Sequence, residues 1–270
     1  DEPGNADAGG RAAFLPALYR SERTVAERLR RLLESPKAGG VNRRDAIRAA
    51  QQDLSLRLAP AQQSAVERAL TDKVLIVTGG PGTGKTTIIS AILRIFSGSS
   101  GKIRLAAPTG RAAKRMSEAT GAAAMTIHRM LEFSLQKGGF QRNENRPLSC
   151  DLMIVDEASM IDTSLMAHLL RAVPDTATVV FVGDVDQLPS VGAGSVLAEM
   201  IAAGRIPVVR LTEIFRQARA SRIVVNAHRI NRGRMPALDN PGRGIPRSDF
   251  YFLEQEDPER VLERSEEHTS

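Results

Sequence analysis

The chain has 270 residues, of which 42% are hydrophobic and 25% are charged, as expected for a folded protein that buries a core. It contains no apolar run of the roughly 18 residues that a membrane span needs, and its first residues lack the basic-then-apolar pattern of a signal peptide. Because Cys150 is the only cysteine, an internal disulfide is excluded. Together these features favour the cytoplasm.

The charge balance suits a polyanionic partner. The net charge is +6 with 37 Lys and Arg residues, although an arginine-rich genome would also produce such a surplus. Aromatic residues make up only 4% of the chain, so extensive base stacking is not expected. Contacts to backbone phosphates are favoured instead.

The chain begins with helical patterns. Residues 1–12 are polar and glycine-rich, which is typical of a frayed end. From Leu18 to Leu33, apolar residues recur at helical spacing with arginines between them. We interpret this stretch as an amphipathic helix that packs on the core, with a DNA-contacting helix as the alternative. A second helix is predicted over Arg43 to Leu56.

Apolar runs alternate with helical patterns over the rest of the chain. The runs are nearly continuous, as expected for parallel strands covered on both faces, so an α/β doubly wound sheet is predicted. The predicted strands are Val74–Val77, Ile103–Ala107, Leu152–Val155, Thr178–Val182 and Pro207–Leu211. The predicted helices are Thr86–Phe96, Arg111–Thr120, Ser164–Ala172 and Gly194–Ala203.

The segment GGPGTGKTT follows the first of these strands and leads into a helix. Glycines let a backbone wrap around a phosphate, and amides with a helix N-terminus face its negative charge. The lysine can reach the β- and γ-phosphates, and the threonine after it can ligate Mg²⁺. The segment therefore predicts a site for ATP and Mg²⁺. Its residues are Gly79, Gly80, Pro81, Gly82, Thr83, Gly84, Lys85, Thr86 and Thr87.

Two acids follow the strand-like run LMIV. Ligands bind at the carboxyl edge of a parallel sheet, where Asp156 can hold Mg²⁺ and Glu157 can polarise the attacking water. One strand later, Gln187 stands where an amide could contact the γ-phosphate or orient that water, with a structural Gly/Pro-rich turn as the alternative. We predict that Lys85, Asp156, Glu157 and Gln187 are catalytic.

Seven segments in order resemble the RecD-like branch of superfamily 1 DNA helicases, which includes the exonuclease V alpha subunit and its stand-alone relatives. The resemblance spans roughly residues 13–263. It implies RecA-like motor domains, ATP hydrolysis coupled to 5′ to 3′ translocation on single-stranded DNA, and a role in recombination and repair. The segments are LAPAQQ, APTGRAAKRM, TIHRML, MIVDEASM, GDVDQLPSVGAGSVL, LTEIFRQA and NAHRINRG.

The resemblance also implies roles for single residues. Gln62 matches a glutamine that reads the adenine edge, and Arg216 matches an arginine of the second motor domain that reaches the γ-phosphate and completes the catalytic set. DNA-binding residues are implied in two segments, with a capped core histidine as the alternative for His128. These residues are Pro108, Thr109, Gly110, Arg111, Thr126 and His128.

The resemblance implies four regions. We expect an N-terminal helical region over 1–55, the first motor domain over 56–205, and the incomplete start of a second over 206–263. Residues 264–270, RSEEHTS, fit nothing in the family and correspond to a read-through sequencing adapter, so we expect an artefactual tail on a truncated chain. Resequencing the locus tests this, and a genuine stop codon after Ser270 would contradict it.

The sequence therefore indicates a fragment of an ATP-dependent DNA helicase, with single-stranded DNA and other subunits of a helicase–nuclease complex as partners. Two alternatives stay open. One is a DNA-binding ATP switch, against which Glu157 and Gln187 argue. The other is the helicase part of a conjugative relaxase.

Overall fold

The computed structural model separates the chain into two compact units. The first comprises Asp1–Gly80 and Gly84–Thr212, and the second comprises Pro81–Thr83 and Glu213–Ser270. The residues that the structure describes are 15–37, 43–97, 101–215, 221–238, 248–252 and 254.

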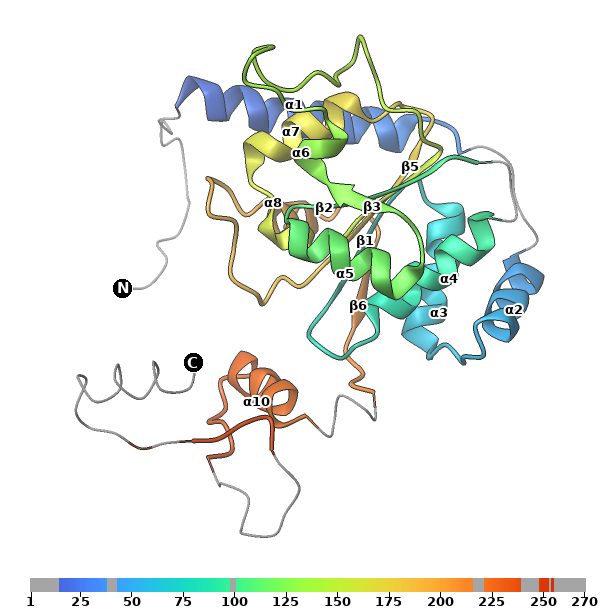
Figure 1. Ribbon diagram of the computed structural model, residues 1–270, viewed down its shortest axis with the longest axis vertical. Helices are drawn as coiled ribbons and strands as arrows, with labels where there is room; N and C mark the ends of the chain where they lie inside the picture. Colours follow the sequence, from blue (N-terminus) through green and yellow to red (C-terminus); the bar gives the residue numbers. More distant parts are fainter. Residues whose placement is uncertain are drawn as a thin grey trace. The chain divides into compact units, whose positions relative to one another are not determined.

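A six-stranded, all-parallel sheet forms the centre of the first unit (Figure 1). The strand order is β3-β2-β4-β5-β1-β6, so β5 lies between β1 and β4. The four strands β1, β2, β4 and β5 carry mostly buried side chains, as a sheet covered on both faces requires. The strands are β1 (Val74–Gly79), β2 (Ile103–Ala107), β3 (Ala124–Thr126), β4 (Leu152–Val155), β5 (Thr178–Gly183) and β6 (Val208–Leu211).

Helices cover both faces of the sheet, and alternate strand residues point to opposite faces. Val74 and Ile76 face one core, and Leu75 and Val77 face the other. The first core is closed by α1 (Pro16–Glu34), α6 (Ile127–Met130), α7 (Thr163–Ala172) and α8 (Val196–Ala202). The second is closed by α2 (Arg43–Asp53), α3 (Pro60–Thr71), α4 (Lys85–Ser97) and α5 (Gly110–Thr120).

The predicted α/β class is confirmed, and each of the five predicted strands is present. The short strand β3 and the helices α3 and α6 were not predicted. Strand β3 has only three residues, all half-buried, so it lacks the apolar run that marks the other strands.

The first unit extends further along the chain than the expected domain boundary after residue 205. Strand β6 pairs in parallel with β1, with Ile76 opposite Val208 and Val77 opposite Val209. The unit therefore closes after Thr212, because β6 belongs to its sheet.

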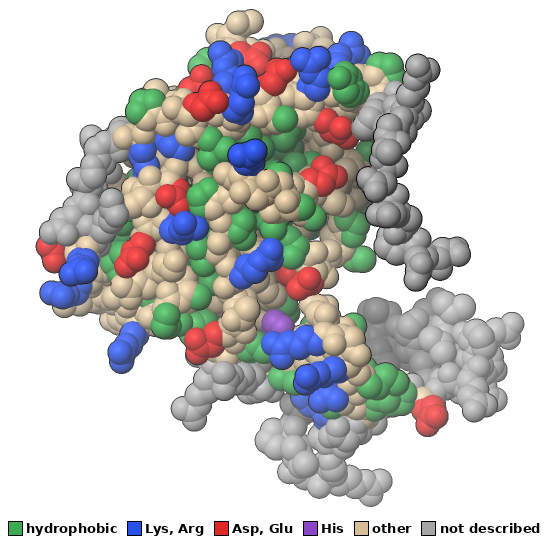
Figure 2. Space-filling view, turned by 180° about the vertical axis from the view of Figure 1, so that it is seen from behind, with side chains coloured by type: hydrophobic (Ala, Val, Ile, Leu, Met, Phe, Trp, Pro, Cys, Tyr) green, Lys and Arg blue, Asp and Glu red, His purple; other side chains and the backbone are tan. Residues whose placement is uncertain are grey.

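Helix α1 packs on the core, as the amphipathic interpretation of this stretch predicts. Val25, Leu29 and Leu32 are buried in the first core. Charged side chains of both signs lie along the surface that carries α1 (Figure 2), including the pairs Arg23–Glu27 and Arg30–Glu34. This balanced surface is unlike the single-sign face of a helix that binds a polyanion.

Arg28, Lys37 and Lys73 each bind backbone carbonyls inside the first unit. Arg28 of α1, which is 6% exposed, donates from Nε to Leu170 O at 3.1 Å and from a terminal nitrogen to Val173 O at 2.7 Å. Lys37 donates to carbonyls at the end of α3, and Lys73 donates to carbonyls of the loop before β5. Burial lowers the pKa of Lys73. Arg28 thereby joins α1 to the end of α7, Lys37 joins the segment after α1 to the end of α3, and Lys73 joins the start of β1 to the loop before β5.

The single thiol is buried. Cys150 precedes β4 and is packed in the first core, where burial raises the pKa of its thiol to about 11. A thiol with such a pKa stays protonated near neutral pH.

The second unit contains α10 (Arg222–Asn231) among its described residues. Ser221 caps this helix by accepting a hydrogen bond from Val224 N, and Asp249 accepts one from Arg222 N. Asn226 is buried and exchanges two hydrogen bonds with the backbone of Ala237. Side-chain bonds therefore order this short segment. Across both units, the described helices include none with the length and apolar character needed to cross a bilayer.

We expect Arg28→Met to lower the free energy of unfolding by about 1–3 kcal/mol, because it leaves the carbonyls of Leu170 and Val173 without their donor. Urea denaturation followed by circular dichroism measures the change. Arg20→Met, on the exposed side of the same helix, is the control and should leave the midpoint unchanged. Equal midpoints for both variants would contradict the capping role of Arg28.

Candidate active site

The predicted phosphate-binding segment connects β1 to α4. The buried strand ends at Gly79, and the helix begins at Lys85. Gly82 and Gly84 adopt φ angles of 74° and 80°, which side chains other than glycine rarely tolerate. The left-handed turns and the helix start give the loop geometry that anions bind.

Lys85 lies folded back over this loop. Its ammonium donates to Gly79 O at 2.5 Å and to Gly80 O at 3.2 Å. The side chain is half-buried, so its charge is directed at the loop rather than at bulk solvent. A phosphate bound in the loop would take up these donor positions.

Asp156 follows β4 at the same edge of the sheet. Its backbone amide donates to Ala106 O at 2.9 Å, and its Oδ1 accepts from Glu157 N at 2.9 Å. Burial raises the pKa of Asp156, and the bond from Glu157 N and the charges of Lys85 and Arg115 act in the opposite direction. The structure therefore brings this carboxylate into the electrostatic range of Lys85.

Glu157 has a left-handed backbone, with φ 51° and ψ 40°. Such a conformation costs a non-glycine residue free energy and is concentrated at functional sites. Its Oε2 is buried and has no hydrogen-bond partner among the described residues. Burial, Asp156 and Asp184 raise the pKa of Glu157, whereas Lys85 and Arg115 lower it. Glu157 thus offers an unsatisfied carboxylate oxygen beside Asp156.

The loop after β5 carries Gln187, whose side chain is exposed. Its Nε2 donates to Asp184 Oδ2 at 3.3 Å, and Asp184 Oδ1 accepts from Asp186 N at 3.1 Å. Asp184 is only 1% exposed. Asp184 was not predicted as a site residue, although an acid directly after a buried strand was the available signal.

Two glycines let this loop pack against the start of α7. A Cβ on Gly192 would lie 2.2 Å from Asp162 Oδ2 and 2.8 Å from Asp162 Cβ. A Cβ on Gly194 would lie 2.0 Å from Thr163 Oγ1, and Thr163 N donates to Ala193 O at 3.0 Å. The segment is therefore a fixed structural turn as well as the carrier of Gln187.

The first predicted DNA-binding segment lies at the carboxyl end of β2. Thr109 caps α5, because its Oγ1 accepts from Ala112 N at 3.2 Å. Gly110 and Arg111 are exposed in the first turn, and Pro108 is half-buried. A Cβ on Gly110 would meet no atom within 4 Å, so no described neighbour covers this side of the helix start.

The second predicted DNA-binding segment follows β3, the neighbour of β2. Thr126 caps α6 by accepting from Arg129 N at 3.2 Å. His128 is exposed, so the interpretation of this residue as a core histidine is wrong. Its ring lies against Phe133 and Phe140.

The remaining residues that were predicted to bind the nucleotide lie in different environments. Gln62 is buried in α3, where its Oε1 accepts from Ala59 N at 3.0 Å. Thr86 is exposed in the first turn of α4, and Thr87 is half-buried beside it. Arg216 lies outside the described residues.

The residues available for a metal ion are few. The described residues contain no group of three or more His, Cys, Asp or Glu side chains that could hold a metal by themselves. Mg²⁺ is commonly bound through one or two carboxylates together with substrate phosphates. The half-buried carboxylate of Asp156 and the hydroxyl of Thr86 fit that donor set.

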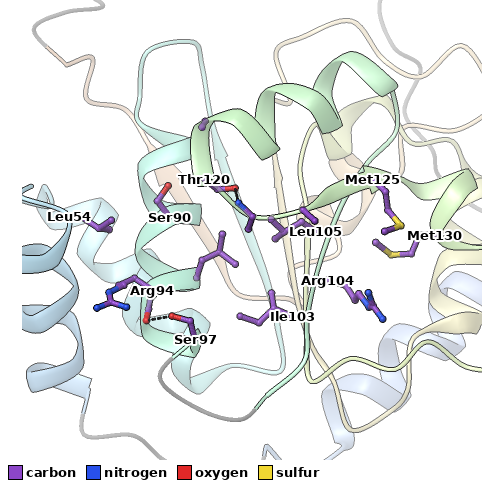
Figure 3. A pocket seen from close by; sticks show the side chains of 14 residues that line it. Leu54, Ser90, Arg94, Ser97, Ile103, Arg104, Leu105, Thr120, Met125 and Met130 are labelled. Atoms are coloured by element: carbon purple, nitrogen blue, oxygen red, sulfur yellow. Dashed lines mark hydrogen bonds between the residues drawn. The ribbon is translucent and has the colours of Figure 1, made fainter.

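A hollow of about 460 Å³ lies elsewhere, between α4, α5 and the start of β2 (Figure 3). Its lining includes Ile103 and Arg104, which open β2, and Ser97, which ends α4. Arg94 at its rim is paired with Asp53 at 2.6 Å. The hollow therefore lies toward the amino end of the sheet, whereas the loop and the carboxylates lie at the carboxyl end.

Comparison with known proteins identifies the family to which this chain is similar. The sequence profile of an AAA domain family matches residues 62–193. The ATP-dependent RecD2 DNA helicase of Deinococcus radiodurans is 39% identical over 224 residues, covering 83% of this chain and 30% of that protein. The RecD subunit of the RecBCD enzyme of Mycobacterium tuberculosis is 36% identical over 219 residues, covering 71% of this chain and 36% of that protein.

The chain belongs to the RecD-like family. It spans about a third of the length of these two relatives. Among solved structures, the Pif1 helicase from Candida albicans has the same fold, with a TM-score of 0.52 at 24% identity over 70% of this chain and 50% of that one. The match to the AAA domain family includes the phosphate loop, both acids and the Gln187 loop of this RecD-like chain.

We expect Gly192→Ala to lower the free energy of unfolding by about 1–3 kcal/mol, because the added methyl group overlaps Asp162. Thermal and urea denaturation of the RecD-like chain measure the loss. Leu188→Ala changes an exposed residue of the same loop and should have no effect. Wild-type stability for Gly192→Ala would show that the loop is not held against α7.

Proposed function

We propose that this chain is the ATP-binding motor segment of a DNA helicase that hydrolyses ATP to translocate 5′ to 3′ along single-stranded DNA in recombination and repair. The observation that carries the proposal is that Lys85 follows β1 while Asp156 and Glu157 follow β4, two parallel strands that flank β5 and end at the same edge of the sheet. Both similar proteins are named as a helicase or as a subunit of the RecBCD enzyme, which supports the same conclusion.

In the proposed reaction, loop amides and Lys85 bind the β- and γ-phosphates. Thr86 and Asp156 would hold Mg²⁺, which would neutralise phosphate charge when bound. Glu157 accepts a proton from the attacking water through its carboxylate, and Gln187 orients that water once its bond to Asp184 is exchanged. A protein that only binds ATP as a switch has no need of the second acid.

Other proposed contacts extend from this centre. Gln62 reads the adenine edge, and Arg216 completes the γ-phosphate environment. DNA lies over the carboxyl ends of β2 and β3, where Pro108, Thr109, Gly110, Arg111, Thr126 and His128 are found. We further propose that the motor works in the cytoplasm and associates with other subunits, as the name of the Mycobacterium relative says of that protein.

We expect Lys85→Ala to weaken ATP–Mg binding by about ten- to a hundredfold, because charge-assisted hydrogen bonds to the phosphates are lost. Isothermal titration of the 270-residue chain with a non-hydrolysable ATP analogue measures the affinity. Lys102→Ala, a lysine at the opposite end of the sheet, is the control. Unchanged affinity for Lys85→Ala would remove the phosphate loop from the proposal.

We expect Glu157→Gln to bind ATP normally and to hydrolyse it about 10²–10⁴ times more slowly, because only the proton acceptor is lost. Single-turnover hydrolysis, in a chain that includes both motor domains, is compared with a binding titration of the same variant. Parallel loss of binding and hydrolysis would assign Glu157 a structural role.

A further inference from the structure

Four aromatic rings cluster beside the second predicted DNA-binding segment. His128 lies 5.7 Å from Phe133, edge to face, and 5.4 Å from Phe140. Phe133 and Phe140 are 4.9 Å apart, and Phe140 lies 4.6 Å from His168 of α7. Four aromatic side chains gather here in a chain that has few of them.

The cluster has an inner and an outer half. Phe140 and His168 are half-buried, and burial lowers the pKa of His168. His128 is exposed, and Phe133 keeps 45% of its surface in solvent. We call the exposed pair, His128 and Phe133, the aromatic shelf. A purely structural cluster would bury its large apolar rings, because burial of apolar surface is what stabilises it.

The segment that carries Phe133 is held in place by ion pairs. Glu132 has a left-handed backbone with φ 53°. Its carboxylate accepts from Arg142 at 2.6 and 2.8 Å and pairs with Arg146 at 3.0 Å. The bond from Arg142 lowers the pKa of Glu132. Phe133 N also donates to His128 O at 3.0 Å, so the two shelf residues are fixed to each other.

The shelf lies beside the proposed DNA path. Strands β2 and β3 are neighbours, with Ala107 opposite Thr126 in register. The segments that follow them therefore start at the same edge of the sheet. Arg129, adjacent to His128, is exposed and adds positive charge there. Rings beside cations form the combination that binds a single strand, because the cations attract phosphates and the rings stack on bases.

We propose that the aromatic shelf stacks one unpaired base of single-stranded DNA. The inference rests on the proposed function, and it adds a local base contact to a surface from which only phosphate contacts were expected. The occupant is a nucleobase rather than an apolar peptide because a cation flanks the rings and because a stacked base needs only one partly exposed ring, which Phe133 supplies. Stacking carries no sequence preference, since every base has a π-face.

The test compares Phe133→Ala with the wild-type chain in binding to fluorescein-labelled oligothymidine, by anisotropy over a range of salt concentrations. We expect affinity to fall by about 5- to 150-fold, the effect of losing one stacked base. The slope of log affinity against log salt should not change, because no phosphate contact is removed. Phe133→Tyr should retain wild-type affinity.

An abasic oligonucleotide of the same length separates stacking from other losses. Phe133→Ala and wild type should bind it equally, because it offers phosphates without bases. Leu135→Ala removes an apolar side chain that is 85% exposed on the same segment, and it should bind both oligonucleotides as wild type does. Phe133→Leu keeps apolar bulk without a π-face, so it controls for altered folding and should resemble Phe133→Ala.

Each other result overturns a distinct claim. Wild-type affinity of Phe133→Ala for oligothymidine, or an equal loss on both oligonucleotides, refutes base stacking and leaves DNA binding intact. A shelf that serves a protein partner gives the first of these results. Absence of binding by the wild-type chain to either oligonucleotide refutes the proposed function itself.

Discussion

The pairing of β5 with β1 on one side and with β4 on the other is the constraint on which the site depends. Its register sets Thr78 opposite Gly183 and Val155 opposite Phe181, so the three strands end at nearly the same level. The phosphate loop and the two acids are therefore separated by one strand. Gly183 ends that strand. A Cβ there would lie 2.8 Å from Leu197 and 3.2 Å from Ser159 N, so the missing side chain lets the segment after the acids cross over β5.

Much of this arrangement is predictable from the sequence, because the buried strands are continuous apolar runs and the loop has a distinctive spacing. The order of the strands in the sheet is not predictable in this way, because five similar apolar runs do not show which strands pair with each other. For the same reason, the pattern predicted a strand over Pro207–Leu211 but did not assign it to the sheet of the first unit.

Single side chains were predicted less completely than strands. The type and position of Glu157 indicated its chemistry, but the left-handed backbone and the unpartnered oxygen depend on packing far away in the sequence. His128 could not be assigned to core or surface from its neighbours alone. The low aromatic content of the chain predicted little base stacking. Composition could not show that four aromatic rings lie together at one place in the fold.

The positive charge of the chain also has more than one use. Arg28, Lys37 and Lys73 are bound to backbone carbonyls, so they stabilise the fold and do not contribute to an open basic surface. The net charge of the chain therefore overstates the amount of positive charge that is available to bind a polyanion. The exposed arginines at the carboxyl edge, such as Arg111 and Arg129, are better guides to where phosphates bind.

The burial of the Cys150 thiol has a practical consequence for site-selective labelling. With a pKa of about 11, Cys150 has far less thiolate near neutral pH than an exposed cysteine, by roughly two to three orders of magnitude. Maleimide dyes react with thiolates, so a cysteine introduced by Leu135→Cys would be labelled selectively in the otherwise unaltered chain. A fluorophore there would lie on the segment that carries Phe133, and its emission could report nucleotide and DNA binding as they occur.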